Sequence, residues 1–315
     1  MKEIGGYFEL ENFAGAEYHR DCYRLNTARN ALLFLCRSKA IKKVYLPYFL
    51  CESVYQCLAK NNILVEFYHI NERFEPLIDN EIKSGEFLYF VNSYGQFNNA
   101  RLSEYVNRYH NIIIDNVHAF FQSNLTGVDT IYSCRKFFGV PDGAYLYSDC
   151  KGFELEQDIS MARMKHILGR YERSAKEYFK DFQASDNEFE DMPILKMSKL
   201  TNNLLKAIDY DKIINVRKRN YAILANSLSQ KNVLELGDQD VPFCYPLYVE
   251  NGNIVRKELI ENNIFVPTLW TNVSKEYGAN DLEIQLAANI LPIPCDQRYD
   301  SDDMNLLTKK IKEIL

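Results

Sequence analysis

The sequence predicts an α/β protein with a mostly parallel central sheet covered by helices and a smaller C-terminal α+β domain. Short apolar runs alternate with segments of helical spacing between residues 25 and 146, which is the pattern of strands joined by crossover helices. The uncharged run Ile112-Ile113-Ile114 is typical of a strand that is buried on both faces of a parallel sheet. No Gly-x-Gly-x-x-Gly motif follows the first strand, which disfavours a dinucleotide-binding sheet.

The N-terminal half supplies the elements of this sheet in order. Residues 1–24 are aromatic and mixed in charge, and we expect them to form an arm that lies over the body. Thr27 is a favourable N-cap, and apolar residues follow it at helical spacing as far as Leu35. Further along, the apolar pattern predicts strands at residues 43–46, 64–68, 87–92, 112–114 and 130–132 and helices at 52–61 and 103–109.

The C-terminal part is predicted to form a second, smaller domain. A charged helical segment from residue 151 ends in the acidic connector 186–191, which places the boundary near residue 190 and gives domains 1–190 and 191–315. At 315 residues, the chain also exceeds the length at which a single core usually stops growing. In the small domain we expect two helices between residues 198 and 229, strands at 243–249 and 265–270, a helix at 254–262 and a final helix capped by Ser301.

Composition and charge argue against several classes of function. The net charge of −6 gives no general attraction to nucleic acid or to an anionic membrane, and no apolar run has the length of a membrane span. The eight cysteines include no Cys-x-x-Cys pair, which indicates free thiols in a reducing compartment and no structural zinc. Because the N-terminus is too polar for a signal peptide, we expect a cytoplasmic protein without a metal site.

Acidic, imidazole, hydroxyl and lysine side chains are predicted to meet at one edge of the sheet. Asp115 ends the apolar run and His118 follows three residues later, while the next strand leads into Ser133 and Lys136. The carboxyl ends of parallel strands form the ligand crevice of such sheets. Pyridoxal phosphate needs a lysine for its Schiff base, an acid at its pyridine nitrogen and hydroxyls or backbone amides at its phosphate. Each residue alone has a commoner structural explanation, so this prediction depends on their order and spacing.

These motifs resemble those of the DegT/StrS family of sugar aminotransferase-like proteins, which have fold type I of the pyridoxal-phosphate enzymes. Asp115-Asn116-Val117-His118 is similar to the family's Glu-Asp-x-Ala-[His/Gln] element. Ser133-x-x-Lys136 has a spacing seen widely in fold type I, and residues 91–96 resemble a hydrophobic-His-x-Tyr-Gly-Gln segment. The similarity covers most of the chain and is strongest from residue 25 to 146.

The resemblance implies a role for each candidate residue. Lys136 would carry the cofactor, Asp115 would contact the pyridine nitrogen, and His118 would lie beside the ring. Thr27 and Ala28 match the family's Gly-Thr-x-Ala-Leu element, which contacts the cofactor phosphate, and Ser133 would add a hydroxyl. For Thr27 an ordinary capped helix is the structural alternative. Weaker contributions to substrate binding are expected from Tyr94, Gln96 and Arg298.

Departures from the family pattern bear on the ring-stacking position. Family members place an aromatic residue four positions after the proline that corresponds to Pro47, and this chain has Cys51 there. We expect Tyr48 or Phe49 to stack on the ring instead, with core packing of both as the alternative. Ile114 also stands where the family usually has Glu, which the contact to the ring nitrogen does not require.

The stretch between Asp115 and Lys136 is shorter than is usual in the family, so other lysines enter the comparison. Lys151 and Lys165 are the nearest downstream alternatives to Lys136. Arg298 and Trp270 could reach a substrate held between the two lobes. The structural alternatives are an ion pair with an acidic neighbour for Arg298 and core packing for Trp270.

The expected activity is that of a pyridoxal-phosphate-dependent aminotransferase. The resemblance implies a keto-sugar nucleotide as acceptor, glutamate or a similar amino acid as donor, and a role in surface polysaccharide or deoxyamino-sugar biosynthesis. It also implies a homodimer with its sites at the subunit interface. Two alternatives stay open. One is a different reaction of the same cofactor, such as dehydration of a deoxysugar or chemistry on an amino acid. The other is a non-catalytic relative that keeps the fold.

Overall fold

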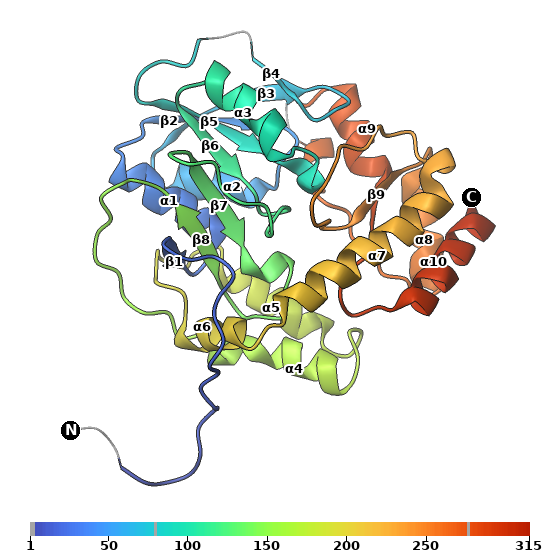
Figure 1. The fold of residues 1–315 in the computed structure, drawn as a ribbon. Coiled ribbons are helices and arrows are strands. Elements are labelled where there is room, and N and C mark those ends of the chain that lie inside the picture. The colour runs from blue at the N-terminus through green and yellow to red at the C-terminus, as the bar shows by residue number, and fades with distance from the viewer. Residues whose placement is uncertain (1–3, 79–80, 276–277) are drawn as a thin grey trace.

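An eight-stranded sheet with the strand order β1-β8-β7-β6-β5-β2-β3-β4 forms the centre of the computed structural model, which describes residues 4–78, 81–275 and 278–315 (Figure 1). Five neighbouring strands, from β7 to β3, run parallel, and antiparallel strands flank them on both sides. The predicted fold class is therefore confirmed. The strands of this sheet are β1 (Tyr23–Leu25), β2 (Lys43–Pro47), β3 (Leu64–Ile70), β4 (Pro76–Leu77), β5 (Glu86–Val91), β6 (Ile112–Asp115), β7 (Asp129–Ser133) and β8 (Ala144–Tyr147).

The direction in which the sheet grows reverses between β2 and β5. From β2 the chain continues to β3 on one side, whereas from β5 it continues through β6 to β7 on the other side. Such a reversal opens a crevice at the carboxyl ends of the two central strands, where ligands bind in open α/β sheets. The segments that follow β2, β5, β6 and β7 all begin at this edge.

Helices cover both faces of the sheet because successive strand residues point to opposite sides. Ile113 and Ile131 belong to the apolar core that includes α1, whereas Ile112 and Ile114 belong to the core that includes Leu102 of α3. The run Ile112-Ile113-Ile114, predicted to be buried on both faces of the sheet, therefore contributes side chains to two apolar cores. The helices are α1 (Ala28–Ser38), α2 (Glu52–Lys60), α3 (Asn99–Arg108), α4 (Lys165–Glu172), α5 (Phe179–Glu188), α6 (Lys199–Lys206), α7 (Tyr210–Leu228), α8 (Gly252–Glu261), α9 (Asp281–Asn289) and α10 (Ser301–Ile314).

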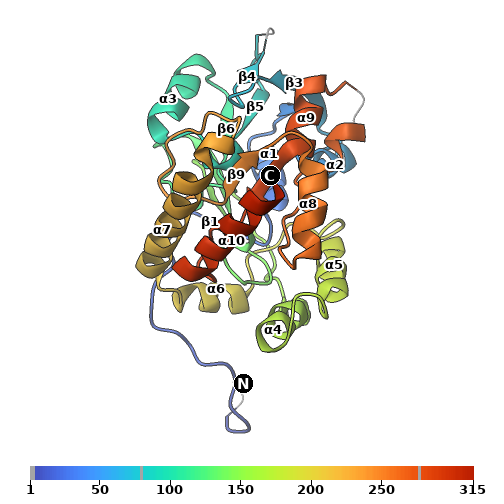
Figure 2. The same cartoon turned by 90° about the vertical axis from the view of Figure 1, so that its right-hand side faces the viewer.

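A smaller unit lies beside the sheet and is drawn from orange to red in Figures 1 and 2. Its two strands, β9 (Tyr245–Tyr248) and β10 (Ile290–Ile293), pair antiparallel, and residues of α7, α8 and α10 pack with them in one apolar core. The chain is still attached to the large sheet shortly before this unit, because Lys196 forms a bridge with Leu25 of β1. The division near residue 190 stays a prediction.

Two details of the predicted C-terminal part are wrong. The segment 265–270 forms no strand, since Pro267 lacks a backbone donor and Trp270 has a φ of 60°. The partner of β9 is β10 instead. The final helix is capped one residue earlier than expected, by Asp300, whose side chain accepts hydrogen bonds from the amides of Asp302 and Asp303.

The expected N-terminal arm lies against the body only in part. Residues 4–16 are all exposed, but Glu11 and Phe13 bond to Asn203 of α6, and it is the segment before them that projects away from the body below α6 (Figures 1 and 2). The chain enters the body at Glu17, whose buried carboxylate accepts hydrogen bonds from Arg24 at 2.9 Å and from the Tyr145 hydroxyl at 2.7 Å. The first three residues of the predicted arm lie outside the described residues.

In the described parts of the chain, no helix combines the length and the apolar character that crossing a bilayer requires.

Candidate active site

The carboxyl edge of the parallel strands brings together the residues that the sequence marks. Asp115 is the last residue of β6 and pairs with Val91 of β5 and Ile131 of β7. Ser133 ends β7, and Lys136 ends the short 3-10 turn Cys134–Lys136 that follows it. Because these strands are parallel neighbours, the side chains that follow them collect at one end of the sheet.

Asp115 is a buried carboxylate held by two hydrogen bonds. Asp115 is only 3% exposed. The Tyr89 hydroxyl donates to its Oδ2 at 2.7 Å, and the Val117 amide donates to its Oδ1 at 2.9 Å. Burial raises the pKa of Asp115 to about 6, while these two bonds and the charge of Lys136 act in the opposite direction. The carboxylate therefore lacks a full counter-charge, and a cation placed beside it would be stabilised.

His118 is a neutral imidazole within an aromatic stack. Its ring lies parallel to that of Phe243, with centroids 4.3 Å apart and planes 5° apart. The Tyr94 amide donates to its Nδ1 at 3.3 Å, which leaves its proton on Nε2. Burial, and next the charge of Lys136, hold the pKa of His118 well below its usual value. A neutral imidazole at this place can donate a hydrogen bond from Nε2.

Lys136 is exposed to a cleft and is electrostatically coupled to both groups. Its charge lowers the pKa of Asp115 and also that of His118. No ion-pair partner of Lys136 is found in the described parts of the chain. The sequence Ser148-Asp149-Cys150-Lys151 has the same Ser-x-x-Lys spacing, but it follows the antiparallel strand β8 and so lies toward the opposite edge of the sheet. The fold therefore favours Lys136 over Lys151.

The start of α1 lies next to the turn that carries Lys136. Gly143 connects them, because its amide donates to the Asn26 carbonyl at 2.6 Å and its carbonyl accepts from the Cys134 amide at 3.0 Å. Thr27 caps α1 by accepting from the Asn30 amide. Within the described chain, the amides of Ala28 and Arg29 have no hydrogen-bond acceptor. These two free donors at a helix N-terminus suit an anion such as a phosphate.

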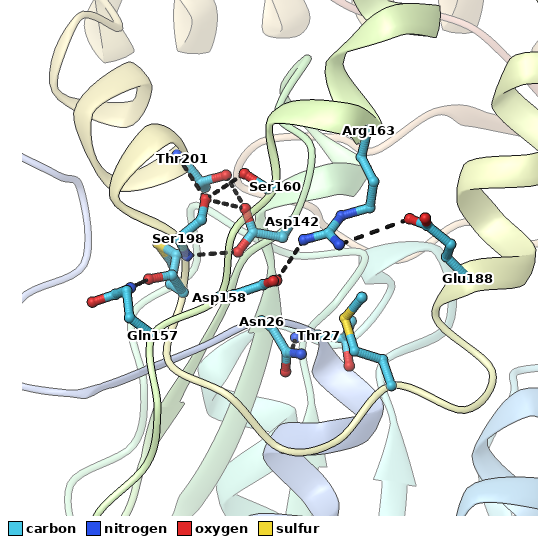
Figure 3. A network of polar contacts seen from close by, with 12 residues as sticks. Asn26, Thr27, Asp142, Gln157, Asp158, Ser160, Arg163, Glu188, Ser198 and Thr201 are labelled. Atoms are coloured by element: carbon cyan, nitrogen blue, oxygen red, sulfur yellow. Dashed lines mark hydrogen bonds and ion pairs between the residues drawn. The ribbon is translucent and has the colours of Figure 1, made fainter.

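A buried polar network fixes the loop that follows Lys136 (Figure 3). Asp142, which is fully buried, accepts 2.7 Å hydrogen bonds from the amide and from the hydroxyl of Ser198, and a further one from the Thr201 hydroxyl. Ser160 donates to the Ser198 hydroxyl at 2.7 Å. A buried ion pair between Asp158 and Arg163 lies beside these residues. The network joins the loop to the segments before α4 and at the start of α6.

We expect Asp142→Ala to destabilise the protein by on the order of 3 kcal/mol, because it leaves one amide and two hydroxyls buried without their acceptor. Urea denaturation measures the change. Asp238→Ala, at an exposed position, is the matched control and should lie within about 0.5 kcal/mol of wild type. Equal midpoints for the two variants would show that the network does not hold the loop.

The two aromatic residues expected at the ring-stacking position are packed elsewhere. Tyr48 stacks on Phe67 and His69, with centroids 4.9 and 4.8 Å apart. Phe49 is 1% exposed and lies edge-on to Trp270 at 4.4 Å. Phe49 thus lies in the apolar core and Trp270 packs against that core, whereas Tyr48 is half-buried and outside it. Cys51 is exposed at the N-cap of α2.

The residues expected to contact substrate have mixed placements. Tyr94 is 1% exposed and lies in an apolar core. Gln96 is buried, and its Oε1 accepts from the Gly237 amide at 2.7 Å, so it joins the sheet to the segment that precedes β9. Arg298 lies at the cleft but forms a two-pronged ion pair with Asp296 at 2.7 and 2.8 Å. The ion-pair alternative for Arg298 therefore describes the structure.

A cleft of about 790 Å³ separates the Lys136 turn from the smaller unit. Its walls are aromatic and proline side chains, including Phe137, Phe243 and Pro294. Among the described residues, it carries five cationic side chains and one carboxylate, that of Asp296. The cations are Arg135, Lys136, Arg170, Arg217 and Arg298. Asp115, His118 and Thr27 do not line the cleft. Phe243 lines it and covers the ring of His118.

Several residues of this region are not predictable from local sequence. Tyr89 contacts Asp115 only because β5 and β6 are neighbours in parallel register. Phe243 and Arg217 reach the site from the smaller unit, and the Arg217 guanidinium donates to the Phe243 carbonyl at 3.1 Å. The sequence predicts only a helix in the region of Arg217. The order of strands around the switch point is the one signal that could have identified Tyr89.

Solved structures with a similar fold include sugar aminotransferases. A DegT/DnrJ/EryC1/StrS aminotransferase from Brucella abortus superimposes with a TM-score of 0.64 at 14% identity, over 93% of this chain and 86% of that chain. NtdA from Bacillus subtilis, solved with its cofactor PMP, gives 0.66 at 12% identity over 94% and 73%. The PMP form of Spr1654, a putative sugar aminotransferase from Streptococcus pneumoniae, gives 0.65 at 14% identity over 93% and 85%.

This chain has the sugar aminotransferase fold. The match extends over both the large sheet and the smaller unit, since it covers 93–94% of the chain. No protein-family model matches the sequence, and no curated protein matches it. At 12–14% identity the likeness establishes the fold, and the chemistry must be argued from this chain's own residues.

Proposed function

We propose that this protein is a pyridoxal-phosphate-dependent aminotransferase with Lys136 as the residue that holds the cofactor. The observation that carries the proposal is the position of Lys136, which is exposed to the cleft and acts electrostatically on both buried Asp115 and His118. The same arrangement is what the order of the motifs predicts. Solved neighbours of this fold contain PLP or PMP, which supports the choice of cofactor.

The donor set at the sheet edge fits pyridoxal phosphate. Asp115 uses only part of its accepting capacity on Tyr89 and Val117, and no ion pair to it is found in the described parts of the chain. A protonated pyridine nitrogen would supply a counter-charge. The unpaired amides of Ala28 and Arg29, within the described chain, suit the phosphate. Ser133, 8% exposed at the end of β7, is the hydroxyl nearest in sequence to Lys136.

Lys136, Asp115 and His118 would have separate roles in the reaction. When bound, the cofactor supplies an electron sink that weakens the bonds at the amino acid α-carbon. Lys136 is placed to hold the cofactor and then to move a proton with its Nζ, for which its amine must be neutral part of the time. Asp115, kept ionised, would hold the pyridine nitrogen protonated. His118 would present its Nε2 proton to the ring.

We further propose a keto-sugar nucleotide as acceptor, an amino acid such as glutamate as donor, and a place in deoxyamino-sugar or surface polysaccharide synthesis in the cytoplasm. Support comes from the cleft, where Arg135 and Arg170 join Lys136 on aromatic walls. Such walls suit a base or a sugar ring, and guanidinium groups suit phosphates. A homodimer belongs to the same proposal.

Reduction of the purified protein with borohydride, followed by peptide mass mapping, tests the assignment directly. We expect a reduced pyridoxyl group on the peptide that contains Lys136, with Lys151 and Lys165 unmodified. Modification of Lys151 or Lys165 in place of Lys136 would overturn it. Release of an α-keto acid from the donor in equal amount to bound cofactor separates transamination from other reactions of the same cofactor.

A non-catalytic relative of the same fold is the second candidate. It is favoured by the exposed Cys51 at the expected stacking position, by the core packing of Phe49 and by the stacking of half-buried Tyr48 on Phe67, which give these two rings other partners. A purified protein that stays colourless and spectrally unchanged on addition of pyridoxal phosphate would support this candidate against the first.

A further inference from the structure

The arm, defined as residues 4–16, exposes far more apolar surface than a free segment of a stable fold normally does. Ile4, Tyr7 and Phe8 are 94%, 98% and 97% exposed. Three large apolar side chains that lie so close in sequence and face solvent indicate a surface that another chain covers. The arm also contains Glu9 and Glu11 and no basic residue. It is therefore an apolar and acidic segment.

Its attachment to the body is confined to its C-terminal part. Asn203 of α6 accepts from the Phe13 amide at 2.9 Å and donates to the Glu11 carbonyl at 2.7 Å. Gly15 lies against the Lys206 carbonyl so closely that a Cβ would stand 2.1 Å from it, which explains the glycine at this crossing. Residues 4–10 extend beyond α6 into solvent (Figure 1). The hydrogen bonds of Glu11 and Phe13 to Asn203 fix the direction in which residues 4–10 leave the body, and the side chains of residues 4–10 are exposed.

The cleft and the hairpin beside it have the complementary chemistry. The hairpin formed by α4 and α5 exposes Leu168, Tyr171, Phe179 and Phe182 by 53%, 88%, 54% and 43%, and Tyr171 and Phe182 line the cleft. Arg170, next to Tyr171 on α4, is exposed and has no ion-pair partner among the described residues. The hairpin and the cleft thus offer apolar surface and unpaired positive charge, which complement an acidic and aromatic segment such as the arm.

From this complementarity we infer that the arm of one copy of the chain packs across the mouth of the cleft of a second copy, with Tyr7 and Phe8 on the hairpin and Glu9 and Glu11 facing Arg170. In a two-fold dimer the exchange is reciprocal, so each cleft is completed by residues of the other chain. The inference rests on the homodimer proposed above and is independent of the aminotransferase activity.

A lipid surface fits the same features less well. Anionic membranes attract segments rich in lysine and arginine, whereas the arm carries two glutamates and no cation. The hairpin does not compensate, because α4 and α5 contain acidic as well as basic side chains, for example Asp181 paired with Lys165 at 2.7 Å. Charge therefore favours a second copy over a membrane.

Two measurements test the inference together. Tyr7→Ser with Phe8→Ser, at positions that are almost fully exposed, should leave the fold intact and raise the dimer Kd by at least about tenfold, the typical effect of removing interface aromatic residues. Sedimentation velocity over a concentration series reads the change. The matched control is Val233→Ser with Ile254→Ser, two apolar residues that are 67% and 60% exposed outside the arm and hairpin, and it should leave the Kd unchanged.

The second measurement decides which copy the arm covers. In a Cys51→Ser background, a short bis-maleimide should join Phe8→Cys to Tyr171→Cys between chains and give a covalent dimer, which neither single cysteine variant gives. A cross-link within one chain, no cross-link, or an unchanged dimer Kd in the serine variant would each overturn the inference. So would binding of the arm to phosphatidylglycerol vesicles without an effect on dimerisation. Cofactor attachment to Lys136 is read separately by peptide mapping, so failure of this inference and failure of the proposed function are distinguishable.

Discussion

Lys136→Ala is expected to lower the rate of amino-group transfer by a factor of roughly 10²–10⁴, the usual contribution of a positioned acid–base group. The reason is that Lys136 is the cation at the cleft that also acts on Asp115 and His118. Its removal takes away both the attachment point and the proton carrier. The measurement is single-turnover release of the α-keto acid from the donor, together with the absorbance of the bound cofactor.

Two matched variants separate this loss from a general loss of charge or fold. Lys151→Ala removes an exposed lysine with the same Ser-x-x-Lys spacing at the opposite edge of the sheet, and full activity is expected. Lys136→Arg keeps the charge near Asp115, but the guanidinium does not deprotonate in proteins, so it cannot carry the proton. The lysine assignment is falsified if Lys136→Arg turns over like wild type.

The fold, the place of Asp115 at the end of β6 and that of Lys136 just after β7 could be predicted because they depend on local pattern and on a general property of parallel sheets. An apolar run that ends in a polar residue marks the carboxyl end of a strand, and neighbouring strands place those ends together. Thr27 likewise caps α1 as expected, because capping involves only residues within one turn. The roles of these residues with a cofactor stay predictions.

What the sequence does not indicate depends on contacts between distant segments. Tyr48 and Phe49 follow a strand just as a stacking aromatic would, yet Phe67, His69 and Trp270 supply other partners for their rings. The segment 265–270 has the composition of a strand, but Pro267 and the conformation of Trp270 prevent pairing. No pattern within a single segment carries this information.

The cleft could not be predicted for the same reason. Its cations come from the Lys136 turn, from α4, from α7 and from the segment after β10, which are separated by tens of residues. In the sequence, Arg170 belongs to a helix of alternating charges, which usually marks a solvated face. Arg217 is 2% exposed and donates to the carbonyls of Pro242 and Phe243, and its burial follows from the packing of α7 on the smaller unit.

Asp115→Asn is expected to weaken cofactor binding by about 2–5 kcal/mol, roughly 30- to 4,000-fold in Kd, since it removes one partner of a buried charge pair. The Val117 amide can still donate to the amide oxygen, and the Tyr89 hydroxyl can turn to accept from the amide NH2 group, so the local structure should persist. Equilibrium titration with pyridoxal phosphate, followed by absorbance, measures the affinity. A Kd within threefold of wild type corresponds to a change in binding free energy of about 0.7 kcal/mol or less. Such a small change would mean that the carboxylate does not hold the ring nitrogen.

The same substitution has the opposite effect on the cofactor-free protein, and pH separates the two. Burial raises the pKa of Asp115 from 3.8 to about 6 in the folded state, so between these values the folded chain binds more protons than the unfolded chain. Stability then falls as pH rises through this window, by about 3 kcal/mol in all, and the cost levels off above about pH 7. Asparagine does not titrate, so Asp115→Asn should gain about 2–3 kcal/mol relative to wild type between pH 4 and pH 7.

Urea denaturation of both cofactor-free proteins at the two pH values gives this difference directly, with the exposed Asp238→Asn as the control that should show none. A stability difference that does not change with pH would show that Asp115 already has its counter-charge without cofactor. A gain near the expected size would show that the folded chain keeps a buried carboxylate at a cost to its own stability. Such a cost is recovered only when a cation binds beside it, which is the physical reason to assign this position to the cofactor.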